Sequence, residues 1–101
     1  MRDPSTIPDM TELRAEIDRT DRQLIELMAH RARLIDRAIA LKPALGWPAR
    51  IDARVEEVVE NARNAAFAQS LDPDLVEEIW RRMVEWSIAR EEIVLGKGER
   101  G

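Results

Sequence analysis

Polar side chains interrupt two apolar stripes in this sequence, and their types and spacing could do chemistry. In the first stripe, Arg31 follows Leu24 by seven residues and Lys42 follows Ala38 by four, so both cations stand at positions that helical spacing gives to apolar residues. The two cations are 11 residues apart, which is about 20° in helical phase and about 16 Å along the axis. Because each side chain reaches about 6 Å, both can lean into one pocket.

The second stripe carries groups of complementary character. Ser87 and Glu91 stand one helical turn apart, where the inward-facing stripe continues. Unpaired charges are costly to bury, so these residues require partners. Two interpretations remain open. One is an internal salt bridge such as Arg31 with Glu91, with Lys42 reaching water at a helix end, and the other is a pocket for an anionic ligand.

Arg14 adds a third cation near the opposite end of the first stripe. It lies 17 residues before Arg31, about 25 Å along a helix, so the two cannot share a site within one chain. In an antiparallel homodimer, Arg14 of one chain approaches Arg31 of the other. This arrangement predicts two equivalent sites, each built from the partner subunit's Arg14 with Arg31 and Lys42 of the home chain, and suited to a small dicarboxylate.

The elements that must position these residues are predicted to be helices, because apolar residues recur at helical spacing and no stretch alternates as a strand does. The first helix starts at an N-cap, Asp9, with Glu12 as its capping-box partner. It runs to Lys42, where Pro43 stops or bends the chain. A loop is expected over residues 43–48 because of its proline and glycine content.

Two further helices complete the predicted fold. The second follows the loop, and the third restarts at Asp72-Pro73, an N-cap acid followed by proline at the first helical position. Gly96 is predicted to end the third helix as a C-cap. The expected fold is therefore all-α, a three-helix protomer with one very long N-terminal helix.

The length of the first helix predicts an oligomer. Roughly 33 residues make a rod of about 50 Å, whereas a compact chain of 101 residues has a diameter of about 33 Å. The apolar stripe continues along almost the whole rod, and a partner chain must cover it. The expected arrangement is an intertwined antiparallel homodimer.

The amino-acid composition and the net charge argue against several classes of function. With 45% hydrophobic and 36% charged residues, the chain is predicted to form a single globular domain over residues 1–101, with flexible tails at 1–8 and 97–101. The net charge of −4 argues against nucleic-acid binding. The chain has no cysteine and one histidine, which argues against a disulfide framework, a thiolate nucleophile or a bound metal. No membrane span or signal peptide is recognised, so a cytoplasmic protein is expected.

Several motifs together carry a family resemblance. They are Leu13-Arg14-x-x-Ile17-Asp18-x-x-Asp21, His30-Arg31-Ala-Arg33, Lys42, Arg54, Leu71-Asp72 and Ser87. Through them the sequence resembles the all-helical, AroQ-type chorismate mutase family, including its isochorismate-pyruvate lyase relatives, over about residues 10–95.

The resemblance implies a homodimer with two active sites and no cofactor. It implies that the partner subunit's Arg14 and Arg31 bind substrate carboxylates, and that Lys42 donates to the ether oxygen. Arg54 matches the family's arginine at the pocket entrance, and Ser87 matches a polar position near the ring carboxylate. The implied reaction is the pericyclic rearrangement of chorismate to prephenate in aromatic amino-acid biosynthesis. This reaction needs no nucleophile. The enzyme has to hold the substrate in its reactive conformation and to donate hydrogen bonds to the ether oxygen.

Two departures from the family pattern affect the expected function. Glu91 stands where the family often has a glutamine donor, so it must be protonated to help, and activity should rise toward acid pH. Without substrate, Glu91 can pair with Lys42. Ile51 and Val55 stand where many mutases place acids for the C4 hydroxyl, which makes Val55 a substrate-binding candidate. An isochorismate-pyruvate lyase, a mutase for 4-amino-4-deoxychorismate and a non-catalytic helical dimer that binds an anion or a partner protein remain alternatives.

Overall fold

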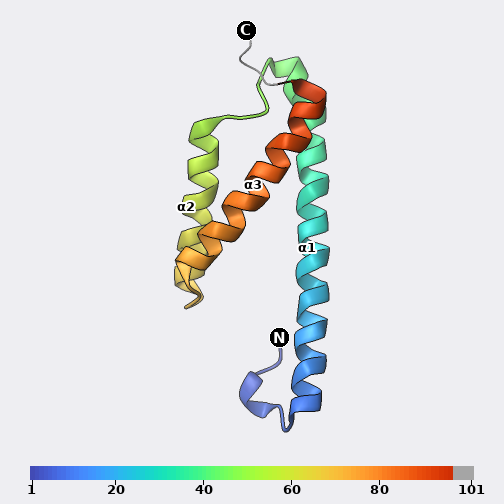
Figure 1. Cartoon of the computed structure of the whole chain (residues 1–101), viewed down its shortest axis with the longest axis vertical. Coiled ribbons are helices and arrows are strands. Elements are labelled where there is room, and N and C mark those ends of the chain that lie inside the picture. Colours follow the sequence, from blue (N-terminus) through green and yellow to red (C-terminus); the bar gives the residue numbers. More distant parts are fainter. Residues whose placement is uncertain (97–101) are drawn as a thin grey trace. The chain divides into compact units, whose positions relative to one another are not determined.

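The computed structural model describes residues 1–96, and these residues are helical with no strand among them (Figure 1). A short 3-10 helix, η1 (Pro4–Thr6), precedes three α-helices: α1 (Met10–Leu45), α2 (Asp52–Ala68) and α3 (Pro73–Leu95). The predicted all-α class with one very long N-terminal helix is confirmed. The predicted tail at 97–101 lies outside the described residues.

The start of α1 is set by a local cap. The Asp9 carboxylate accepts a hydrogen bond from the Glu12 backbone N–H at 2.8 Å, which confirms the predicted N-cap. The Glu12 carboxylate is 3.2 Å from the Arg2 guanidinium, so an ion pair ties the segment before the helix to its first turn. Asp3 caps η1 by accepting from the Ser5 N–H at 3.0 Å.

The end of α1 differs from the prediction. Pro43 does not stop the helix, which continues through Leu45, so the connection to α2 covers residues 46–51 rather than beginning at Pro43. A proline here loses its own N–H hydrogen bond and crowds the carbonyl four residues before it, but only two residues of the helix follow it, so the disturbance is confined to the helix end. Gly46 ends the helix instead, at a φ of +70°. The N–H groups of Gly46 and Trp47 donate to the carbonyls of Pro43 and Lys42, both at 3.1 Å, in a Schellman motif.

The third helix has the predicted caps at both ends. The Asp72 carboxylate accepts from the Asp74 N–H at 2.9 Å, and Pro73 takes the first helical position. At the other end Gly96 has a φ of +77°, and its N–H donates to the Glu92 carbonyl at 2.8 Å. The restart at Asp72-Pro73 and the end at Gly96 are therefore confirmed.

Helices α2 and α3 pack against each other around two small apolar clusters. The first consists of Ala49, Val84 and Ile88, with Val55, Val58 and Leu95 against it. The second consists of Ala62, Ala66 and Val76, with Trp80 against it. Alanines on α2 allow the helix axes to approach closely, since they place little between the backbones.

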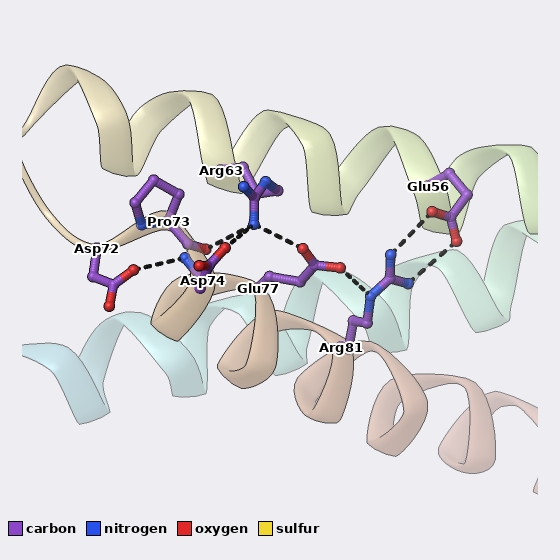
Figure 2. A network of polar contacts seen from close by, with 7 residues as sticks. All are labelled: Glu56, Arg63, Asp72, Pro73, Asp74, Glu77 and Arg81. Atoms are coloured by element: carbon purple, nitrogen blue, oxygen red, sulfur yellow. Dashed lines mark hydrogen bonds and ion pairs between the residues drawn. The ribbon is translucent and has the colours of Figure 1, made fainter.

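A chain of ion pairs joins the outer faces of α2 and α3 (Figure 2). Arg63 of α2 contacts Asp74 at 2.9 Å and Glu77 at 2.8 Å, both on α3. Arg81 of α3 contacts Glu77 at 2.6 Å and reaches Glu56 of α2 at 3.1 Å. These hydrogen bonds from Arg81 are the main cause that lowers the pKa of the Glu56 and Glu77 carboxyls.

The chain divides into two compact units after Leu34, within α1. No side chain of α1 is buried. Its large exposed apolar side chains include those of Met10, Ile17, Leu24, Ile25, Leu27, Met28, Leu34, Leu41 and Leu45. Much of the apolar stripe expected on the first helix is thus exposed in the single chain, although its members Leu13, Ile35, Ala38 and Ile39 are half-buried.

Candidate active site

Lys42 and Glu91 form a largely buried ion pair. Lys42 comes from the last turns of α1 and Glu91 from α3, with 2.8 Å between Lys42 Nζ and Glu91 Oε1. Glu91 is 4% exposed. The sequence allowed this pairing as well as that of Arg31 with Glu91, and each side chain supplies a charge opposite to that of the other.

The geometry of this pair leaves one carboxylate oxygen without a hydrogen bond. The contact has the distance of an ion pair but not the angles of a hydrogen bond, and the buried Oε1 accepts none from the described residues. Buried polar atoms almost always have hydrogen-bond partners, and here the nearby ammonium gives this oxygen an opposite charge in place of a hydrogen bond. A carboxyl oxygen in this position can take up a proton and donate it to an acceptor held beside Lys42.

The Lys42 ammonium has a second partner, which sequence reasoning missed. Nζ donates a hydrogen bond of 3.0 Å to the backbone carbonyl of Ala49, in the connection between α1 and α2. Ala49 is buried in the cluster with Val84 and Ile88. No side-chain pattern signals this contact, because every residue carries a carbonyl and only the path of the loop selects this one.

Ser87 lies one turn before Glu91 on the same buried face of α3. It is 3% exposed, and its hydroxyl donates to the Met83 carbonyl at 3.0 Å. Serine commonly satisfies its proton in this way inside a helix. The structure therefore brings Lys42, Glu91 and Ser87 into the unit that follows Leu34, although Lys42 precedes Ser87 by 45 residues in the sequence.

The two residues expected near α2 have different surroundings. Arg54 lies in the first turn of α2 with an exposed side chain, and it contacts Glu57 at 2.8 Å on its own helix. Val55 is half-buried and packs against the cluster that contains Ala49. Val55 thus belongs to the apolar contacts that hold Ala49, whose backbone carbonyl accepts the hydrogen bond from Lys42.

The other two predicted cations belong to the unit that ends at Leu34. Arg31 is half-buried and Arg14 is exposed, both on α1. They stand on the helix whose apolar stripe is largely exposed.

Two ion pairs that α3 makes with earlier parts of the chain were also missed. Arg90 donates to both Asp36 carboxylate oxygens, at 2.7 and 3.1 Å, and its guanidinium lies 5.5 Å from the centroid of the Trp86 ring. The hydrogen bonds from Arg90 lower the pKa of the Asp36 carboxyl. This contact ties α1 to α3 at the residue before Glu91. The second pair joins Arg50 of the α1–α2 connection to Glu85 of α3.

Comparison with known proteins decides the family. Residues 13–92 match the family model described as chorismate mutase type II. The chain belongs to this family. The matched range contains every predicted site residue, and membership supports the expected enzyme class, a chorismate mutase.

Two curated relatives of this chorismate mutase type II chain carry the name T-protein. The protein from Enterobacter agglomerans is 31% identical over 85 residues, which cover 84% of this chain and 23% of the relative. The protein from Haemophilus influenzae is 33% identical over 82 residues, covering 81% of this chain and 22% of the relative. The chain thus spans less than a quarter of the length of these relatives. No solved structure gives a significant match.

Residues 1–96 lack two other features, a membrane-spanning helix and a cluster of metal-binding side chains. Within this range no helix is long and apolar enough to cross a membrane. The same residues include no group of three or more His, Cys, Asp or Glu side chains placed to hold a metal ion.

Proposed function

We propose that this protein catalyses the rearrangement of chorismate to prephenate. The observation that carries the proposal is the buried Lys42–Glu91 pair in a chain of the chorismate mutase type II family. In this pericyclic reaction a C–O bond breaks as a C–C bond forms, and negative charge develops on the ether oxygen. A half-buried ammonium beside a buried carboxyl group is suited to stabilise that charge.

Glu91 acts as a donor when it is protonated. As a carboxylate it neutralises Lys42 and repels the developing charge on the ether oxygen. As a carboxylic acid it no longer holds the ammonium by charge, and its proton reaches the same oxygen. The two residues then form a pair of donors, and the reaction is faster at acid pH.

The remaining predicted residues bind substrate in this proposal. Arg31 and the partner subunit's Arg14 clamp the two carboxylates and hold the enolpyruvyl arm over the ring. Ser87 lies near the ring carboxylate, Arg54 lies at the entrance, and Val55 borders the ring. No cofactor takes part.

The active form is an antiparallel homodimer. This is supported by α1, which buries none of its side chains and exposes a long series of apolar residues in the single chain. Surface of that extent requires a partner, and a second α1 offers a matching stripe. The antiparallel arrangement also brings the partner subunit's Arg14 toward Arg31, which completes the set of cations.

A product assay tests the proposed function. The purified protein is incubated separately with chorismate and with isochorismate between about pH 5 and pH 8, and products are identified by mass. Prephenate from chorismate supports the proposal, with Lys42→Ala as the inactive control. Salicylate and pyruvate from isochorismate, without prephenate, would replace it with a lyase. Formation of none of these products would refute both enzyme functions and direct attention to partner binding.

A further inference from the structure

The connection between α1 and α2, residues 46–51, is held at two adjacent residues. The Ala49 side chain is buried against Val84 and Ile88 of α3. The next residue, Arg50, donates a hydrogen bond from its guanidinium to the Glu85 carboxylate, also on α3. One α3 segment thus anchors the loop by packing and by charge.

The carbonyl between these anchors is the one that binds Lys42. The bond from Lys42 Nζ to the Ala49 oxygen is 3.0 Å long, and the carbonyl belongs to the peptide that links Ala49 to Arg50. Rotation of this peptide, or a shift of Arg50, moves the oxygen directly. The position of the acceptor therefore depends on where Arg50 is held.

A lysine ammonium needs a fixed hydrogen-bond acceptor if its other donors are to be directed at one substrate atom. Its ammonium sits on a flexible four-carbon chain and carries three donors in a fixed tetrahedral relation. With one donor on the Ala49 carbonyl and the ammonium held 2.8 Å from Glu91 Oε1, the directions of the other two donors are restricted. An unfixed ammonium samples many directions, and few of them suit the ether oxygen.

We propose that Arg50 and Glu85 are positioning residues, which orient the Lys42 ammonium for catalysis by holding the Ala49 carbonyl in place. The inference rests on the proposed role of Lys42 at the ether oxygen. Neither Arg50 nor Glu85 touches substrate; they act through the loop. Neither residue is among the site residues predicted from the sequence.

The pair is better suited to positioning than to stability. The side chains of Arg50 and Glu85 are 41% and 57% exposed. Ion pairs this exposed contribute little to the free energy of unfolding. The hydrogen bond between them lowers the pKa of the Glu85 carboxyl and raises that of Arg50, so the pair stays charged over the range of the proposed assay. Loss of the pair should therefore affect the orientation of Lys42 far more than folding.

Enzyme kinetics with single and exchanged charges test the inference. We expect Arg50→Gln and Glu85→Gln each to lower kcat about tenfold with KM within about twofold, since small displacements of a catalytic group are costly. The exchanged pair Arg50→Glu/Glu85→Arg should recover kcat to within about threefold of the parent protein. The control is Arg81→Gln, which also removes an interhelical ion pair, to Glu56, but lies in the network of Figure 2, and its kcat should be unchanged. If both single variants keep parental kcat, the inference is wrong.

Chemical labelling tests the same inference without reference to activity. The chain has only two lysines, Lys42 and Lys97, so acetic anhydride labelling followed by mass spectrometry gives their reactivity ratio in one digest. The Lys42 to Lys97 ratio should rise at least about threefold in Glu85→Gln and Arg50→Gln, and stay constant in Arg81→Gln, because an ammonium released from its acceptor is more often accessible. An unchanged ratio in folded variants, checked by circular dichroism, overturns the inference. Absence of prephenate from the parent protein refutes the proposed function instead, and the labelling ratio still decides whether the loop positions Lys42.

Discussion

Lys42 Nζ lies 2.8 Å from Glu91 Oε1 in a largely buried position, yet this oxygen accepts no hydrogen bond from the described residues. The Lys42 ammonium compensates the charge of this oxygen without a well-aligned hydrogen bond, so the attraction within the pair is mainly electrostatic. The arrangement keeps two opposite charges together while leaving a carboxyl oxygen able to carry a proton. We expect the pH dependence of activity and the stability of the site to depend on this pair.

The first prediction concerns Glu91→Gln and the pH dependence of activity. Glutamine donates its amide N–H at every pH, whereas the carboxyl donates only when protonated. If Glu91 donates as a carboxylic acid, the parent protein should be more active at acid than at neutral pH, and Glu91→Gln should hold a nearly constant kcat. Steady-state rates of prephenate formation measure both profiles.

Glu78→Gln provides the matched control for this experiment. Glu78 is an exposed carboxylate on the same helix, so its replacement should leave the parental profile intact. Parallel profiles for Glu91→Gln and the parent protein would contradict the role of Glu91 as a protonated donor.

The second prediction concerns Lys42→Met and the free energy of unfolding. Removing the ammonium leaves the Glu91 carboxylate buried without an opposite charge, which should destabilise the protein by about 3 kcal/mol. The double variant Lys42→Met/Glu91→Leu removes both charges and should recover most of that loss. Urea unfolding followed by circular dichroism measures the three values at one protein concentration. Equal stability of the single and double variants would show that the pair is not electrostatically coupled.

The third prediction concerns acid and the network of Figure 2. Hydrogen bonds from Arg81 place the pKa values of Glu56 and Glu77 below their ordinary value of 4.5 in the folded chain. A carboxyl with a lowered folded pKa stabilises the fold fully above its unfolded pKa, and this contribution disappears as pH falls through the folded value. The free energy of unfolding should therefore decline below about pH 4.5, less steeply in Arg81→Gln. Urea titrations from pH 3 to pH 7 compare the slopes, and identical slopes would exclude this network as the source.

The caps and the polar residues of the stripes could be predicted from the sequence because their signals are local. Asp9 and Asp72 accept from N–H groups two or three residues ahead, and Gly96 takes a positive φ that other residues avoid. The Lys42–Glu91 pair could be anticipated for a different reason, since opposite charges in buried stripes must find each other.

The end of α1 and the contacts of the α1–α2 connection could not be predicted, because they depend on how the chain folds around them. The sequence places a stop at Pro43, but the end of the helix is decided by Gly46, whose φ of +70° allows the Schellman turn. Arg50 and Glu85 are 35 residues apart and stand at exposed positions, where charged residues need no explanation. Only the path of the loop between α1 and α2 brings them together and directs the Ala49 carbonyl to Lys42.

The last prediction tests the dimer and the shared site together, using Arg14→Ala and Arg31→Ala. Each variant alone should form homodimers in which both sites lack one carboxylate clamp, with kcat/KM reduced at least about 100-fold. In the proposed antiparallel dimer, each site takes Arg31 from one chain and the partner subunit's Arg14 from the other. A mixed dimer of the two variants therefore has one site that lacks both arginines and one site that lacks neither.

Mixing the variants after unfolding and refolding gives about half mixed dimers, each with one complete site, so about a quarter of the parental activity should return. Size-exclusion chromatography with light scattering gives the mass of each preparation. As a control, mixing Arg31→Ala with Lys42→Ala should restore nothing, because both residues belong to the home chain and every site then lacks one of them. Failure of Arg14→Ala and Arg31→Ala to complement each other in a verified dimer would place both arginines in the same chain's site and refute the antiparallel arrangement.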